Sequence, residues 1–150
     1  MGGVARSDKA VMCSKWQINR EKSVIITDMT PFEIWQDPQT KVIFYFSHSD
    51  ENLTTGVMVV PAGTELPKHN RPKAFENLVQ VSGKCLMKVF DENENITEYT
   101  LGVGDTLRME KGQYHIHSNP FEETSYTLFK AEGDITEVMK VLRENFTRVD

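Results

Sequence analysis

Three of the four histidines in this 150-residue chain lie where they could do chemistry: His69, His115 and His117. Imidazole and carboxylate side chains bind divalent metal ions and move protons, so a group of them is where a search for function begins. The first histidine-containing segment carries Gly63, His69, Arg71, Glu76 and Gly83, and the second carries Gly104, Gly112, His115 and Asn119. The fourth histidine, His48, stands beside serines and Asp50 in a polar stretch, and we expect it to be exposed to solvent.

Short strands must position these residues. Runs of β-branched and aromatic residues alternate with clusters of Gly, Pro, Asn and Asp, a pattern typical of strands joined by turns. Many short strands at close spacing favour a sandwich or barrel over alternating strands and helices. Alternate side chains on a strand share a face, so Arg71 would face the same side as His69, and His117 the same side as His115. The nine predicted strands are 24–27, 41–47, 56–60, 75–81, 84–90, 96–101, 105–110, 114–118 and 125–130.

The last segment has a helical pattern instead. Apolar residues recur there at helical spacing, at Ile135, Val138, Met139, Leu142 and Phe146. Asp134 and Glu137 have the spacing of a capping box. We therefore predict one amphipathic helix over 134–147, with its apolar stripe packed on the barrel or on a neighbouring subunit. Residues 1–22 are polar and aperiodic and predict an N-terminal arm, and residues 23–150 predict one domain that includes the helix.

Composition narrows the choice of partners and location. The net charge is −5, from 17 basic and 22 acidic residues, which weighs against a nucleic-acid partner. No apolar run approaches the roughly 18 residues of a membrane helix, and the N-terminal residues lack the apolar core of a secretory signal. We therefore expect a cytoplasmic protein that does not enter a membrane. Cys13 and Cys85 have no CxxC partner and are expected to be free thiols.

The two histidine-containing segments resemble the two motifs of the cupin superfamily, G-x5-H-x-H-x3-4-E-x6-G and G-x5-P-x-G-x2-H-x3-N. Every motif position is matched except two: Arg71 replaces the second histidine of the first motif, and Glu110 replaces the proline of the second. The resemblance implies an all-β fold, a cupin-type double-stranded β-helix or jelly-roll barrel, with the C-terminal helix added to it.

In that family the matched residues hold one divalent metal ion inside the barrel, so the resemblance implies a metal set of His69, Glu76 and His115. Two imidazoles and one carboxylate suit Fe and also accept Mn, Ni or Zn, so the metal identity stays open. His117 could add a fourth ligand, or it could be an ordinary strand residue, as could Tyr114. Arg71 brings a permanent charge and a planar donor fork suited to a substrate carboxylate or phosphate, although its charge also repels a nearby metal ion.

Two functions follow. The first is a divalent-metal-dependent enzyme of oxygenase, isomerase or epimerase, or lyase type that acts on a small anionic metabolite. In it Glu76, His117 and Arg71 would be catalytic, and Arg71 and Tyr114 would bind substrate. The alternative is a non-catalytic cupin used for ligand binding or homodimerisation. Loss of the metal site would begin with the replacement of one ligand by Arg71. Both predict a homodimer, because a small barrel leaves apolar strand and helix surface for a second copy to cover.

Overall fold

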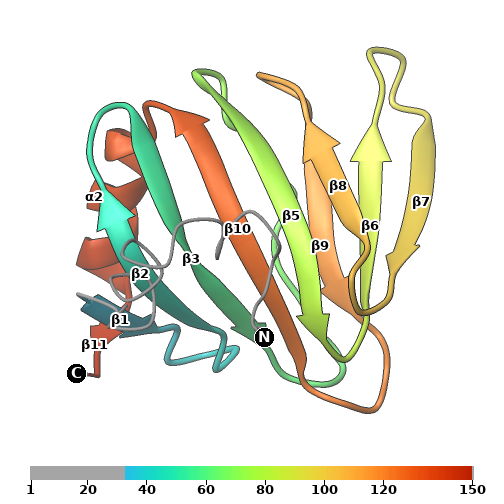
Figure 1. The fold of residues 1–150 in the computed structure, drawn as a ribbon, viewed down its shortest axis with the longest axis horizontal. Helices are drawn as coiled ribbons and strands as arrows, with labels where there is room; N and C mark the ends of the chain where they lie inside the picture. Colours follow the sequence, from blue (N-terminus) through green and yellow to red (C-terminus); the bar gives the residue numbers. More distant parts are fainter. Residues whose placement is uncertain (1–32, 150) are drawn as a thin grey trace, which may run out of the picture. The chain divides into compact units, whose positions relative to one another are not determined.

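The computed structural model describes residues 33–149, which form two β-sheets and one helix (Figure 1). The larger sheet has the strand order β11-β1-β2-β3-β10-β5-β8, and the smaller has the order β4-β9-β6-β7. The strands are β1 (Glu33–Gln36), β2 (Ile43–Ser49), β3 (Leu53–Val60), β4 (Thr64–Glu65), β5 (Ala74–Ser82), β6 (Cys85–Phe90), β7 (Ile96–Leu101), β8 (Thr106–Met109), β9 (His115–Asn119), β10 (Ser125–Gly133) and β11 (Thr147–Arg148), and the helix is α2 (Thr136–Asn145). The predicted all-β jelly roll with a C-terminal helix is therefore confirmed.

The core lies between the inner faces of the two sheets. Side chains alternate between buried and more exposed along β5, β6 and much of β10, as expected for strands that face a core on one side. Leu78 on β5, Met87 on β6 and Phe129 on β10 belong to one buried apolar cluster. A polar network also lies inside, where Gln80 donates to Ser125 Oγ over 2.9 Å and accepts from Thr127 Oγ1 over 2.7 Å.

Eight of the nine predicted strands correspond to strands in the structure, with ends shifted by up to three residues. The ninth, 24–27, lies outside the described residues, as does the predicted arm over 1–22. Three short strands, β1, β4 and β11, were not predicted. β4 and β11 have two residues each and β1 has four, which is too short for a period-two pattern to stand out.

The helix is shorter than predicted, covering 136–145 rather than 134–147. Asp134 does not form the predicted capping box with Glu137: its Oδ1 accepts hydrogen bonds from the backbone N–H and the hydroxyl of Thr136, at 2.9 and 2.7 Å. At the other end Phe146 is extended, because Thr147 and the residue after it pair with β1. The pairing with β1 thus ends the helix earlier than its apolar pattern does.

The apolar stripe of α2 packs on the barrel. Met139 is buried in the core cluster, and Val138 and Leu142 pack against it. Just after the helix, the Phe146 ring lies 5.9 Å from that of Phe44 on β2. These residues of the stripe therefore pack on the chain's own barrel.

An ion pair ties α2 to the sheet. Arg143 donates from Nε and Nη2 to the two carboxylate oxygens of the buried Glu33 on β1, at 2.9 and 2.8 Å. These bonds hold the pKa of Glu33 below its ordinary value. The helix is thereby fixed to the edge of the sheet near β1.

Two expectations from composition can be compared with residues 33–149. The helix formed by these residues lacks the length and apolarity needed to cross a membrane. Cys85 is a buried free thiol, and burial raises its pKa to about 11. Cys13 lies outside the described residues.

Candidate metal centre

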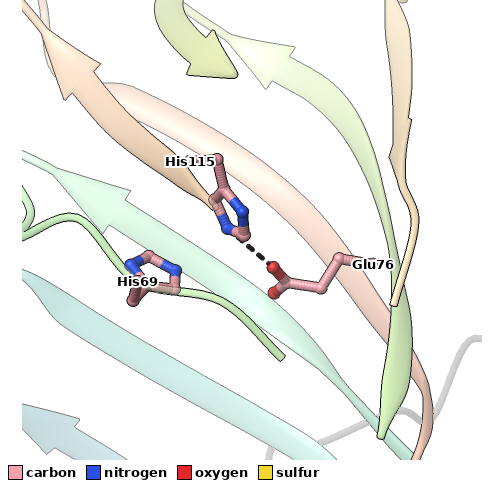
Figure 2. Close-up of side chains that lie close together, drawn as sticks. All are labelled: His69, Glu76 and His115. Atoms are coloured by element: carbon pink, nitrogen blue, oxygen red, sulfur yellow. Dashed lines mark ion pairs between the residues drawn. The ribbon is translucent and has the colours of Figure 1, made fainter. Parts of the chain in front are cut away.

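Three different parts of the fold bring His69, Glu76 and His115 together (Figure 2). Glu76 comes from β5 of the larger sheet, and His115 begins β9 of the smaller sheet. His69 lies in the connection between β4 and β5, where it forms an isolated antiparallel bridge with His115. The backbone N–H of each histidine donates to the carbonyl of the other, at 3.0 and 2.9 Å. Backbone pairing therefore places the two imidazoles side by side before any ligand binds.

The donor atoms of the three side chains lie close to one another. One ligand atom from each residue lies within 4.8 Å of the other two. His115 Nε2 is 2.9 Å from Glu76 Oε1, and the His69 and His115 ring centroids are 4.3 Å apart. Ligand atoms that share one ion at about 2.0–2.2 Å are themselves about 3 Å apart, so the His115–Glu76 pair already has that spacing. Only a small movement of His69 would complete the set.

Backbone carbonyls fix the tautomers of both imidazoles. His69 Nδ1 lies 2.8 Å from the Pro67 carbonyl, and His115 Nδ1 lies 3.0 Å from the Gln113 carbonyl. A carbonyl only accepts, so each Nδ1 must carry the proton, and in the neutral ring Nε2 is left with its lone pair. This arrangement is typical of metal-binding histidines, whose second nitrogen donates to an outer group.

Burial favours the protonation states that a metal site needs. Burial and the charge of Arg71 lower the pKa of His69 to about 4, so its imidazole is neutral at pH 7. Burial alone would raise the pKa of Glu76, but contact with His115 and the charge of Arg71 lower it to about 2. At neutral pH the site therefore presents a buried carboxylate and a neutral imidazole with a free lone pair.

The residues present fit a divalent cation. Glu76 Oε1 is buried and, among the described residues, has no partner with hydrogen-bond geometry, although His115 Nε2 is only 2.9 Å away. A buried carboxylate oxygen without a hydrogen bond is costly, and a cation shared with the facing imidazole would compensate for it. The three donors, two nitrogens and one oxygen, suit Fe, Mn, Ni or Zn.

Arg71 and His117 line the same cavity as the three candidate ligands. Arg71 donates from Nη1 to the Asn70 carbonyl at 3.1 Å, while its buried Nε has no partner in the described part of the chain. His117 is 2% exposed, its Nε2 also lacks a partner, and burial lowers its pKa to about 4. His117 stands outside the cluster of ligand atoms. The structure thus gathers five of the six predicted site residues around one space.

Tyr114 is the sixth, and it lies elsewhere. Its side chain is 45% exposed and lines a surface hollow formed with Phe90 and the 91–94 turn, where Lys68 Nζ lies 5.3 Å from its ring. Strand alternation accounts for this, because Tyr114 immediately precedes His115, which faces inward. His48 is exposed as predicted, and its Nε2 is 2.9 Å from Asp50 Oδ2.

Two other motif residues hold the backbone around the site. The Gly112 N–H donates to the Arg71 carbonyl at 2.9 Å, and its φ of +76° is one that glycine adopts without strain. Asn119 is fully buried and donates to the carbonyls of Val60 and Glu123, at 2.9 and 2.8 Å. These residues support the fold rather than line the cavity.

The apolar wall of the cavity was not recognised from the sequence as part of a site. Phe44, Phe46 and Phe129 line it together with residues of α2. The alternating apolar residues of 41–46 and the methionines at 58, 87 and 109 predicted core packing, and they are indeed core, but they also face the open space. Periodicity shows that a side chain turns inward and does not show where the interior is hollow.

Comparisons with known proteins agree with this geometry. No protein-family model matches the sequence. Germin-like protein 9-1 from Oryza sativa subsp. japonica is 31% identical over 108 residues, which are 67% of this chain, and the chain spans 44% of that relative's length. An RmlC-like cupin from Shewanella frigidimarina NCIMB 400 superposes with a TM-score of 0.58 at 13% identity, over 71% of this chain and 89% of that one.

A recombinant oxalate oxidase in complex with glycolate superposes with a TM-score of 0.52 at 16% identity, over 55% of this chain and 42% of that one. At such identities the structural neighbours show the fold alone, and their chemistry does not transfer with it. Together with the germin-like relative and the two-sheet jelly roll, they show that the chain belongs to the cupin superfamily.

Proposed function

We propose that this protein is a divalent-metal-dependent enzyme that acts on a small anionic molecule. One observation carries the proposal: the donor atoms of His69, Glu76 and His115 lie within 4.8 Å of one another, and His115 Nε2 lies 2.9 Å from the buried Glu76 Oε1. A purely structural or dimerising domain has no physical need for two inward imidazoles and a carboxylate in this arrangement.

In this proposal His69 and His115 hold the ion through Nε2 and Glu76 holds it through a carboxylate oxygen. A bound divalent ion supplies Lewis-acid polarisation of a substrate oxygen. Arg71 supplies a permanent positive charge and a free Nε–H in the same cavity, which orients an anionic group beside the ion. His117, neutral and fully buried, offers one unpartnered ring nitrogen that can hydrogen-bond the substrate or move a proton at Nε2.

The residues of the site suit oxygenase, isomerase or epimerase, and lyase reactions alike. Arg71 favours a substrate that carries a carboxylate or a phosphate, because its donor fork matches the oxygens of either group and it lines the same cavity as the candidate ligands.

Metal content tests the proposal directly. Protein purified without a histidine tag is analysed by elemental mass spectrometry, with His69→Ala and His115→Ala as site variants and His48→Ala as the matched exposed control. We expect near-stoichiometric Fe, Mn, Ni or Zn in the parent and in the control, and none in either site variant. Absence of metal after reconstitution would contradict the proposal and leave the alternative, a cupin used for ligand binding or dimerisation.

We also propose that the protein forms a homodimer through the outer face of the larger sheet. Tyr45, Val57, Leu128 and Val79 are direct neighbours across β2, β3, β10 and β5 on the side away from the core. Leu128 and Val79 are 38% and 37% exposed, so this row leaves apolar surface that a second copy can cover. Analytical ultracentrifugation tests this, since a monomer at micromolar concentration would refute it.

A further inference from the structure

The cavity that holds the candidate metal centre has two chemically different ends. Its volume is about 240 Å³. The polar side chains that line it are His69, Glu76, His115, Arg71 and His117, and all belong to or adjoin the metal centre. The remainder of the lining is apolar and includes the rings of Phe44, Phe46 and Phe129. A molecule in this space would meet polar atoms at one end and hydrocarbon at the other.

The apolar end is built largely from aromatic rings and the helix. Phe129 meets the rings of Phe44 and Phe46 edge-on, with centroids 6.2 and 5.8 Å away. Val138 and Leu142 of α2 line the same end, and Phe146 after the helix adds a third ring. None of these side chains can satisfy a hydroxyl or a carboxylate, so a polar group placed there would lose its hydrogen bonds to water.

The volume limits the size of what fits. An apolar cavity of about 150 Å³ holds a benzene molecule, so about 240 Å³ leaves room for one ring or branched chain and a small polar group. This corresponds to about ten non-hydrogen atoms.

The groups at the polar end favour an anionic ligand. Arg71 Nε is buried without a partner within residues 33–149, and so is His117 Nε2. A metal ion and Arg71 together carry more positive charge than Glu76 balances, and the guanidinium fork matches the two oxygens of a carboxylate. A single carboxylate therefore fits this end better than a neutral group does.

We infer that the ligand of this cavity is a small monocarboxylate with an apolar body, aromatic or branched, of about ten non-hydrogen atoms. Its carboxylate lies between the metal centre and Arg71, and its apolar body lies against Phe129 and the α2 side chains. The inference rests on the proposed function and makes it narrower, because it excludes small substrates that are polar throughout.

Calorimetric titration of the metal-loaded, full-length protein tests the inference with three probes. Phenylacetate has both features, acetate has the carboxylate without the apolar body, and 2-phenylethanol has the body without the charge. Burial of a side-chain-sized apolar group predicts that phenylacetate binds roughly tenfold to a hundredfold more tightly than acetate. We also expect it to bind at least about tenfold more tightly than 2-phenylethanol, because that probe makes no charge-assisted bond to Arg71. If acetate binds as tightly as phenylacetate, or if 2-phenylethanol does, the inference is wrong.

A pair of helix variants locates the apolar body. Val138→Phe fills the apolar end, whereas Val141→Phe makes the same change at a position that is 54% exposed and does not line the cavity. We expect Val138→Phe to weaken phenylacetate binding at least tenfold and acetate binding less than twofold, with Val141→Phe leaving both unchanged. Equal weakening of both probes by Val138→Phe would overturn the placement. Thermal unfolding and metal content of both variants confirm that fold and metal centre are intact.

The same samples separate failure of this inference from failure of the proposed function. Metal content is measured independently of ligand binding. If the protein holds no metal yet prefers phenylacetate in the same order, the ligand class stands and the enzyme proposal falls. If the metal is present and the preference for phenylacetate is absent, the ligand class is wrong and the proposed enzyme function still stands.

Discussion

Replacement of Glu76 by glutamine should destabilise the metal-free protein in a pH-dependent manner. The pKa of Glu76 falls from its ordinary value of 4.5 to about 2 in the folded chain, despite burial, because of His115 and Arg71. One unit of pKa corresponds to about 1.4 kcal/mol, so the ionised carboxylate stabilises the fold by at most about 3 kcal/mol over the neutral form. Glutamine resembles the neutral form in size and lacks the charge.

The direction of the pH dependence follows from the lowered pKa. The contribution of Glu76 is fully present above pH 4.5, where the unfolded chain is also ionised, and it is lost as the pH falls toward 2. Urea unfolding of metal-free parent and Glu76→Gln protein should therefore differ by up to about 3 kcal/mol at pH 7 and converge at low pH. A variant as stable as the parent at pH 7 would refute the reasoning, because the carboxylate would then gain nothing from its charged neighbours.

Three other changes test the site and its supports. His115→Ala should abolish thermal stabilisation by added metal, which at a hundredfold excess over Kd amounts to about 2.7 kcal/mol or roughly 5–11 °C in the parent, while His48→Ala should retain it in a thermal-shift assay. Arg71→Lys should weaken phenylacetate by about tenfold in calorimetry, since the charge remains and the donor fork is lost, and unchanged affinity would show that charge alone suffices. Gly83→Ala should lower the free energy of unfolding, measured in urea, more than Gly63→Ala does: both glycines have positive φ, but an added Cβ would collide with the Thr124 carbonyl at Gly83 and meets nothing at Gly63.

The expectation that His69, Glu76 and His115 form one site came from the resemblance to the cupin motifs, and strand alternation predicted only which side Arg71 and His117 face. His115 and His117 alternate on one strand, so once one faces inward the other does too. Arg71 turns to the cavity as predicted, although His69 lies in an isolated bridge and not in a strand. The same alternation of side chains accounts for Tyr114. It immediately precedes the inward-facing His115, so its own side chain faces the surface.

The apolar end of the cavity could not be predicted, because it depends on contacts between distant segments. The helix was recognisable from its apolar stripe, but its position follows from the Glu33–Arg143 ion pair and from the pairing of Thr147 with Gln36. These contacts join β1 to the helix and to β11, and a single sequence carries no periodic signal for such contacts. The hollow between the helix and the rings is a property of their packing.

The bridge between His69 and His115 has a consequence for the order of folding. The two residues are distant in sequence, and they become neighbours only when the connection before β5 has paired with β9 of the smaller sheet. Glu76 lies on β5 of the larger sheet, so the complete set of ligands also requires that sheet to have formed. Closing such long loops precedes any gain from the contacts they allow. Metal should therefore bind late in folding, to chains whose two sheets have already packed together. It should slow unfolding rather than speed folding.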